Sequence, residues 1–419
     1  MSRLLIIADD LSGAADCASA YARAGRETLV MIDPDAPGDV GTADVVALDA
    51  DSRRMPATTA AQLHLELHAR YAIPGQGFYR KIDSTLRGNF AAEVAAVGSA
   101  AGLAIVAPAF PTAGRTTRDG RQYLNGVALE DTEIWRSEGL SGVAHLPTML
   151  ERHGMTSALL GRADIRCGAG KLAGRLEAVA RNGLQAVVCD VETEDDLRAI
   201  AQASRHLHAP CFWVGSAGLA VHLAQVDGAN AAQPVKVAVN GSILTVVGSL
   251  SGVSKAQAER LQQATGMRRI DIPAGVLRQG ASDPHWSGLQ QALSATLGQG
   301  DDLLLTIGVD GTVDMDEGLH LCQGLARLLA PLAGLLGALI STGGETARAL
   351  LCAMHYRGLR LAGEIEPGVP LSIAVGPRPL PVITKAGAFG NRDTLLHCHA
   401  TLLQARSGAS IPTFHTKGS

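Results

Sequence analysis

The sequence predicts an α/β protein built of two domains with mainly parallel sheets. The chain has 419 residues, which exceeds the size at which one hydrophobic core usually keeps growing. Short runs rich in Val, Ile and Leu alternate with Ala- and Leu-rich stretches of helical length, which is the pattern of βαβ units. Residues 227–234 show neither period and indicate a linker.

We expect the first domain at residues 1–228, a linker at 229–237, the second domain at 238–404 and a tail at 405–419. Helices are expected at Ser12–Arg23, with Ser12 as a suitable N-cap, and at Thr59–Tyr71. The strands of the first domain are predicted from short, apolar, β-branched runs. They are Leu4–Ala8, Thr28–Ile32, Val45–Leu48, Phe78–Lys81, Ala104–Ala107, Ala186–Asp190 and Phe212–Val214.

The second domain repeats this alternation and begins with a strand at Ile243–Val247. Helices are expected at Ser254–Ala264 and Ala347–Met354, each after a loop that contains glycine. Its other predicted strands are Arg269–Ile272, Leu303–Ile307, Leu339–Ser341, Leu371–Val375 and Val382–Thr384.

Composition and charge exclude several classes of function. The net charge is −4 and no basic stripe interleaves with aromatic residues, so we expect no nucleic-acid partner. No apolar run reaches the roughly 18 residues of a membrane helix, and no signal-peptide pattern is seen, so we expect no membrane partner. Seven cysteines without a CxxC pair suit a reduced, cytoplasmic protein. His397–His399 is too small a ligand set for zinc, and we expect no protein metal site.

Polar clusters follow two strands of the first domain. Asp9 and Asp10 come after the first strand, and the segment 80–89 (RKIDSTLRGN) ends another. Because the carboxyl ends of parallel strands border one crevice, these clusters indicate a site for a small, polar, anionic ligand.

The acidic pair leaves three interpretations open. It can cap a helix, where its charge suits the helix dipole. It can also serve phosphate or metal chemistry. A receiver domain is the third interpretation, with Asp49 or Asp51 as phosphoacceptor and Lys81 as its lysine, although a receiver gives the DSTLRG segment no role.

Two arginines lie in loops after strands of the same domain. Arg53 follows the predicted strand Val45–Leu48, and Arg115 ends the proline-containing segment 108–115. Arginine suits bidentate binding of a carboxylate. Both residues are therefore candidates to bind an anion, and both equally fit plain surface arginines.

Glycine-containing loops follow three strands of the second domain, at 248–252 (GSLSG), 341–347 (STGGETA) and 385–390 (KAGAFG). Small residues let backbone N–H groups approach an anion at a helix N-terminus. Three such loops in one domain favour a phosphate-rich ligand. The segment 168–172 (GAGKL) lacks the spacing of a Walker motif, so a P-loop enzyme is excluded.

Taken in order, ADDLSGA, DSR, KIDSTLRGN, PAFPTAGR, GSLSGVS, STGGETA, GEIEPGVP and TKAGAFG resemble the four-carbon acid sugar kinase family over nearly the whole chain. The usual ADDFTG reads ADDLSG here, with Leu11 and Ser12 as conservative departures. The resemblance implies a two-domain kinase with its active site in the interdomain cleft. It would use ATP and Mg²⁺ to phosphorylate the terminal (4-) hydroxyl of a four-carbon sugar acid such as D-threonate or D-erythronate.

Several alternatives remain beside this interpretation. Within the family, the chain could instead be a 3-oxo-tetronate kinase. A phosphoacceptor receiver-like protein or a sugar-acid-sensing protein are alternatives of another class. The expected partners are a sugar acid and ATP, and a homodimer is one open expectation for the oligomeric state.

The resemblance also implies site residues. Asp10 is the expected catalytic base with Asp83 second, Arg53 would clamp the substrate carboxylate, and closure about the linker would assemble the site. The residues expected to bind the acid are Asp10, Arg53, Lys81, Ile82, Asp83 and Ser84, with Arg115 added from its loop. The residues expected to bind ATP are Ser249, Ser251, Gly343, Gly344, Glu345, Thr346 and Gly387.

Overall fold

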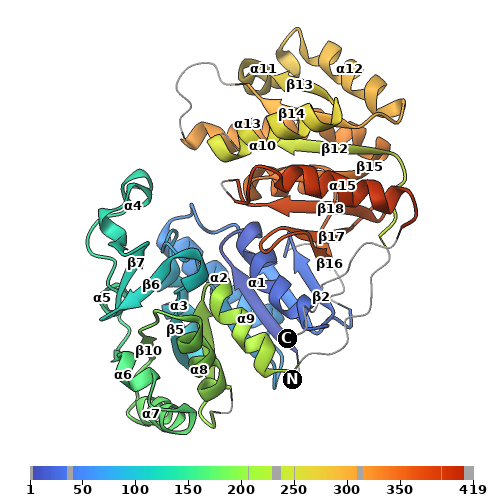
Figure 1. The fold of residues 1–419 in the computed structure, drawn as a ribbon. Coiled ribbons are helices and arrows are strands. Elements are labelled where there is room, and N and C mark those ends of the chain that lie inside the picture. The colour runs from blue at the N-terminus through green and yellow to red at the C-terminus, as the bar shows by residue number, and fades with distance from the viewer. Residues whose placement is uncertain are drawn as a thin grey trace. The chain divides into compact units, whose positions relative to one another are not determined.

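The computed structural model describes residues 3–34, 41–205, 207–228, 237–249, 251–308, 315–387 and 389–409. The chain divides into two compact units (Figure 1). The first comprises Met1–Thr28 and Val40–Ala231, and the second comprises Leu29–Asp39 and Ala232–Ser419. The predicted linker falls almost wholly on residues 229–236, which lie outside the described residues, as does most of the predicted tail.

Parallel strands form the centre of the first unit. They run in the order β3-β1-β4-β11-β5-β10-β9, and each pairs in parallel with its neighbours. Every residue of β1 is buried, as expected for a strand covered on both faces. The bounds are β1 Leu4–Ala8, β3 Val45–Asp49, β4 Gly77–Lys81, β5 Leu103–Ala107, β9 Ser157–Leu160, β10 Ala186–Cys189 and β11 Cys211–Gly215.

Helices of the first unit pack in two groups. One group is α1 (Leu11–Arg23), α9 (Ala217–Val226), α8 (Glu194–Ser204) and α7 (Ala169–Arg181), each packed on the next. In the other, α3 packs on both α2 and α5. The bounds of the remaining helices are α2 Ala57–Tyr71, α3 Phe90–Ala101, α4 Glu133–Ser137, α5 Leu146–Glu151 and α6 Arg162–Ile165, with the 3₁₀ turns η1 Pro111–Ala113 and η2 Leu129–Asp131.

The N-cap of α1 is Asp10 rather than the expected Ser12. The Asp10 carboxylate accepts the backbone N–H of Gly13 at 3.0 Å, which satisfies one free donor of the first turn. A carboxylate also suits the positive end of the helix dipole. Asp10 is therefore fixed in the loop that leaves β1.

A small antiparallel sheet, absent from the sequence-based prediction, is inserted between β5 and β9 of the first unit. Its strands are β6 (Arg115–Arg118), β7 (Arg121–Leu124) and β8 (Val127–Ala128). The carboxylate of Asp190, which follows β10, accepts the backbone N–H groups of Asp119 and Gly120 at 2.8 and 2.9 Å. These bonds fix the β6–β7 turn to the main sheet.

The second unit also has a parallel sheet, but one side of it is antiparallel. Parallel strands run in the order β13-β14-β12-β15-β18, and β17, β16 and β2 continue antiparallel. The strand predicted at Thr28–Ile32 is β2, which pairs with β16 of the second unit. The bounds are β2 Thr28–Met31, β12 Ser242–Val247, β13 Arg268–Ile272, β14 Leu303–Ile307, β15 Leu336–Thr342, β16 Gly358–Glu364, β17 Pro370–Val375 and β18 Leu380–Lys385.

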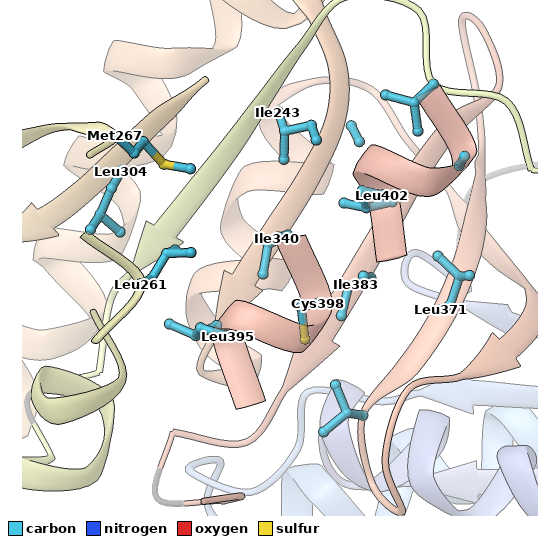
Figure 2. Packing of buried hydrophobic residues seen from close by; sticks show 14 of the residues in the cluster. Ile243, Leu261, Met267, Leu304, Ile340, Leu371, Ile383, Leu395, Cys398 and Leu402 are labelled. Atoms are coloured by element: carbon cyan, nitrogen blue, oxygen red, sulfur yellow. The ribbon is translucent and has the colours of Figure 1, made fainter. Parts of the chain in front are cut away.

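One hydrophobic core of the second unit lies between its sheet and two helices, α10 and α15 (Figure 2). Leu261 of α10 and Leu402 of α15 join Ile243, Ile340 and Ile383 of the sheet, and all five are fully buried. The helices of this unit are α10 Gly252–Thr265, α11 Ala274–Gln279, α12 Trp286–Gly298, α13 Met315–Leu329, α14 Gly344–Ala353 and α15 Thr394–Arg406, with the 3₁₀ turns η3 Gly280–Ser282 and η4 Ala330–Leu335.

These elements confirm the predicted α/β fold with mainly parallel sheets. No described helix combines the length and the apolar character that a membrane span requires.

Candidate functional site

Three loops of the first unit gather at the carboxyl ends of β3, β1 and β4, which are neighbours in its sheet. The loop after β1 carries Asp9 and Asp10, the loop after β3 carries Arg53, and the segment 82–89 follows β4. The polar clusters, which lie far apart in the sequence, thus meet at one edge, as expected of parallel strands.

Arg53 binds both aspartates of the first loop. Its Nε and Nη2 donate to the two oxygens of Asp9 at 2.8 and 3.2 Å, and Nη2 also donates to Oδ1 of Asp10 at 2.8 Å. Burial raises the pKa of Asp9, but the charge and hydrogen bonds of Arg53, with the charges of Arg80 and Lys81, together outweigh it and hold that pKa below its usual value. Asp9 is therefore an anchor for Arg53, a role that sequence reasoning did not assign to it.

Asp10 has one occupied and one open oxygen. Oδ1 accepts from Gly13 and from Arg53, whereas Oδ2 has no hydrogen bond to the described residues. A Cβ at Gly13 would lie 2.6 Å from Asp10 Oδ1 and 2.7 Å from Lys81 Nζ. Only glycine leaves room at this point for the carboxylate and the ammonium together.

Lys81 is 5% exposed and ends β4. Within the described part of the chain its ammonium makes neither an ion pair nor a hydrogen bond, although it lies close enough to Asp9 to lower the pKa of that carboxyl. A buried ammonium without a direct partner is costly. The side chain is therefore available to an anionic ligand.

Asp83 is occupied by neighbours on its own loop. Nε and Nη2 of Arg87 donate to its two oxygens at 2.8 and 3.1 Å, and the hydroxyl of Thr85 donates to Oδ2. Burial opposes ionisation, but the charge and hydrogen bonds of Arg87, with the charge of Arg53 and the hydrogen bond from Thr85, together outweigh it and keep the pKa of Asp83 well below its usual range. Asp83 is thus a firmly ionised acceptor with both oxygens in use.

The rest of this loop is fixed by the main chain and by the inserted sheet. The N–H of Ile82, which is buried, donates to the carbonyl of Gly215 at 2.8 Å. The carbonyl of Ser84 accepts from Gln122 of β7 at 2.9 Å. Leu86 has a φ of +58°, a strained conformation for a residue with a side chain. The loop is thus held in one uncommon shape.

Arg115 begins β6 and lies near Asp83 and Arg87. Burial lowers its pKa, the charge of Asp83 raises it, and the charge of Arg87 lowers it, so the three groups are close enough to interact. Its Nη1 donates to the carbonyl of Ala113, whereas its buried Nε has no partner among the described residues.

The charges of this edge of the first unit do not cancel. We define the acid site as Asp9, Asp10, Arg53, Lys81, Asp83, Arg87 and Arg115. Its four cations exceed its three carboxylates, which leaves one positive charge. Such a site complements a small molecule that carries a single carboxylate.

Three loops of the second unit meet in the same way, at the carboxyl ends of the neighbouring strands β12, β15 and β18. The carbonyl of Gly387 accepts from Ser251 Oγ at 3.2 Å, from Lys385 Nζ at 3.1 Å and from the hydroxyl of Ser254. A Cβ at Gly387 would lie 2.3 Å from the hydroxyl of Ser249. The first and third glycine loops are therefore packed together.

The second glycine loop joins them. The N–H of Gly343 donates to the carbonyl of Lys385 at 2.8 Å, and a Cβ at Gly248 would lie 2.0 Å from Oγ1 of Thr346. Gly344 and the exposed Glu345 begin α14, so their N–H groups belong to its unsatisfied first turn. The expected ATP-binding residues thus surround the N-termini of α10 and α14, a suitable place for phosphate.

The His397–His399 segment lies in α15 and is structural. His397 pairs with Glu366 at 2.7 Å, His399 pairs with Asp302 at 2.9 Å, and Cys398 is buried in the core shown in Figure 2. Among the described residues, no group of three or more His, Cys, Asp or Glu side chains is placed to hold a metal ion.

Comparison with known proteins identifies the chain. Residues 4–223 match a family model described as a sugar-binding N-terminal domain, and residues 244–395 match one described as a nucleotide-binding C-terminal domain. A D-threonate kinase of Cupriavidus necator is 47% identical over 409 residues, which cover 96% of this chain and 99% of the relative. The chain belongs to the four-carbon acid sugar kinase family.

Other members of the family are less similar but also match over nearly their full length. A D-threonate kinase of Bordetella bronchiseptica is 34% identical over 96% of this chain and 98% of the relative. A 3-oxo-tetronate kinase of Cupriavidus necator is 28% identical over 92% of this chain and 94% of the relative. Family membership confirms the expected enzyme class, a kinase, over the receiver-like and sensing alternatives.

Solved structures agree on the fold. A crystal structure from Salmonella typhimurium LT2 has a TM-score of 0.82 at 22% identity and covers 95% of this chain and 99% of that chain. One from Haemophilus influenzae has a TM-score of 0.75 at 20% identity and covers 95% of this chain and 100% of that chain.

Sequence reasoning missed several residues of both sites. Arg87, Gln122, Ser254 and Lys385 all bond to loops that were expected to bind a ligand. Arg87, Ser254 and Lys385 lie inside the motifs KIDSTLRGN, GSLSGVS and TKAGAFG, so their position was a usable signal. No sequence signal pointed to Gln122, because it bonds to Ser84, 38 residues away, from a strand that was not predicted.

Proposed function

We propose that the protein transfers the γ-phosphoryl group of ATP to the terminal (4-) hydroxyl of D-threonate. The observation that carries the choice of an acid is the single excess positive charge of the acid site. The choice of D-threonate over D-erythronate and 3-oxo-tetronate rests on the relatives, because those at 47% and 34% identity are D-threonate kinases.

In this proposal the first unit binds the acid. Arg53 is held on Asp9 and Asp10 through Nε and Nη2, and its Nη1 makes no hydrogen bond to the described residues. Nη1 and the ammonium of Lys81 would together receive the carboxylate. Arg115, whose buried Nε lacks a partner in the described chain, would bind a hydroxyl of the acid.

Asp10 is the proposed base. Its Oδ2 is open, so it can accept a hydrogen bond from the attacking hydroxyl and orient that group for transfer. Asp83 is a poorer base, because Arg87 and Thr85 occupy its oxygens and its pKa lies well below its usual range. Asp83 would instead hold Arg87 and the loop after β4 in place.

The second unit would bind ATP. The N–H groups at the starts of α10 and α14 and the hydroxyl of Ser249 suit the phosphates, and Ser251 caps α10 beside them. Mg²⁺ would be held with those phosphates rather than in a protein cage. The buried hydroxyl of Thr342, which has no partner among the described residues, fits an additional oxygen ligand. When bound, the ion neutralises phosphate charge.

A coupled ADP-release assay over D-threonate, D-erythronate, L-threonate and 3-oxo-tetronate tests the proposal. We expect turnover that needs both ATP and an acid, with the highest kcat/KM for D-threonate. A higher value for 3-oxo-tetronate would move the chain to that subgroup. Acid binding in calorimetry without any turnover would favour a sensor, and a phosphorylated Asp49 or Asp51 would favour a receiver.

A further inference from the structure

Four fully buried polar side chains form a network beneath the acid site. Arg80 comes from β4, His64 from α2, Glu93 from α3 and Ser52 from the loop after β3, and each is 0% exposed. None of them belongs to the acid site, and the proposed chemistry uses none of them. We refer to these four residues as the buried network.

Ser52 is the centre of this network. Its hydroxyl donates to Oε1 of Glu93 at 2.7 Å and lies 2.9 Å from Nε2 of His64, which is 3.3 Å from the same carboxylate oxygen. A carboxylate only accepts, and a hydroxyl has one proton to give. His64 must therefore donate through Nε2. Burial and the charge of Arg80 lower the pKa of His64, which favours the neutral tautomer protonated at Nε2.

The other oxygen of Glu93 accepts from Arg80, which also donates to the carbonyls of Ile7 and Lys81. Burial raises the pKa of Glu93, but the charge of Arg80 and the hydrogen bonds from His64 and Arg80 together outweigh it and keep that pKa well below its usual range. The network therefore ties the carboxyl ends of β1 and β4 to the loop that carries Ser52.

Ser52 is fixed by its main chain as well. Its N–H donates to the carbonyl of Asp9 at 3.1 Å. The residue before it, Asp51, has a φ of +49°, a conformation that persists only when its surroundings hold it. The residue after it is Arg53. Both the main chain and the side chain of Ser52 are therefore held in place. This fixes the position of the backbone from which the Arg53 side chain extends.

We infer that Ser52, His64 and Glu93 are positioning residues that place Arg53 against Asp9 and Asp10, ready to receive the carboxylate of the acid. This inference rests on the proposed function. A role in stability alone explains the network poorly, because well-packed apolar residues often replace buried ion pairs at no cost. A fixed polar network instead gives one defined geometry, and misplacement of a binding group is costly in catalysis.

The test compares His64→Leu, which removes the donor, with His64→Gln, whose amide can donate from the place of Nε2. Ser52→Ala removes the hydroxyl. Ser204→Ala is the matched control, since it removes another buried hydroxyl of the first unit. Ser204 ends α8, and its hydroxyl accepts a hydrogen bond from the indole N–H of Trp213 at 2.8 Å. For each protein the KM for D-threonate, the KM for ATP, kcat and the melting temperature are measured.

We expect His64→Leu and Ser52→Ala to raise the KM for D-threonate by roughly 10- to 100-fold. The KM for ATP should stay unchanged, and His64→Gln should recover most of the loss. Ser204→Ala should lower the melting temperature without a change in either KM. Equal losses in His64→Gln and His64→Leu, or a KM for the acid that follows only the melting temperature, would overturn the inference.

A second measurement separates this inference from the proposed function. Amide hydrogen exchange at Asp51, Ser52 and Arg53 should rise in His64→Leu and not in Ser204→Ala, whatever the substrate is. If the parent protein does not turn over D-threonate, the proposed function fails and exchange still decides on the network. Unchanged amide exchange at these three residues in His64→Leu would show that the buried network does not position Arg53.

Discussion

At the scale of single residues, Asp10 and Asp83 show how similar carboxylates acquire different uses. Both follow strands of the first unit and both were candidates for the catalytic base. Asp10 Oδ2, at the N-terminus of α1, has no partner in the described part of the chain, whereas Arg87 and Thr85 occupy both oxygens of Asp83. The partners of each side chain, rather than its residue type, separate the two roles.

Asp10→Asn should lower kcat by roughly 10²- to 10⁴-fold, because it removes the carboxylate that orients the hydroxyl. The amide oxygen can still cap α1, so the protein should fold and bind ATP normally. Steady-state kinetics together with ADP calorimetry check this. Asp83→Asn is the comparison and should mainly raise the KM for the acid. A loss in Asp10→Asn below about tenfold, or ~1.4 kcal/mol, would exclude Asp10 as the base.

Lys385 allows a prediction on pH. Burial lowers its pKa to about 8, against the raising effects of Cys398 and Glu366. Between about pH 8 and pH 10.5, the unfolded chain therefore binds more protons at this lysine than the folded protein does. Folding stability contributed by Lys385 should rise with pH across that window.

The melting temperatures of the parent and of Lys385→Met, compared at about pH 7 and about pH 10, measure this effect. The other titrating groups are common to both proteins and cancel in the difference. We expect the parent to gain stability relative to the variant at the higher pH. A relative loss at high pH would contradict the lowered pKa.

At the scale of elements, much of the fold could be predicted from local pattern. Strands such as β1 and β5 are continuous apolar runs that are buried at every position. The inserted strands β6 and β7 were missed, because RTTR and RQYL are short, polar and only partly buried. The β17–β18 pair is antiparallel, since the few residues between the two strands leave no room for a crossover helix.

Parts of the two candidate sites could be predicted from the sequence, and other parts could not. The loops that carry Asp10, Arg53 and Gly387 could be predicted, because they follow predicted strands and carry distinctive residues. The contact of Gln122 with Ser84 and that of His64 with Ser52 could not, since each depends on how separate elements pack. Contacts between residues of separate elements cannot be predicted from the local sequence pattern.

The start of α1 gives a prediction at this scale. Gly13→Ala would place a methyl group 2.6 Å from Asp10 Oδ1 and 2.7 Å from Lys81 Nζ, so one of them must move. We expect the KM for the acid to rise by about 10-fold or more, because a small misplacement of binding groups is costly.

Gly174→Ala in α7 is the matched control. A Cβ at Gly174 meets nothing within 4 Å, so the exchange should leave both KM values alone. It should stabilise the protein by about 0.5–1 kcal/mol, because alanine is the better helix former. An unchanged KM for the acid in Gly13→Ala would contradict the prediction, because it would show that Asp10 and Lys81 can move aside without loss of acid binding.

At the scale of the whole molecule, each unit is proposed to bind one substrate, and only one of them needs a metal. Excess EDTA should abolish turnover, because Mg²⁺ neutralises nucleotide phosphates. Binding of D-threonate should persist, since the excess charge of the acid site comes from Arg53, Lys81, Arg87 and Arg115. A coupled assay and calorimetry check the two statements, and added Mg²⁺ should restore activity. Loss of acid binding in EDTA would point to a metal in the acid site.

The strand β2 has a consequence for how the chain is made. β2 is complete once the first 31 residues have been synthesised, yet its antiparallel partner β16 begins only at Gly358. At about 5–20 residues per second, β2 waits for this partner on the order of tens of seconds. An open strand edge is a template for unwanted pairing. The nascent chain therefore passes through a long interval in which a chaperone bound near residue 30 would protect it from aggregation.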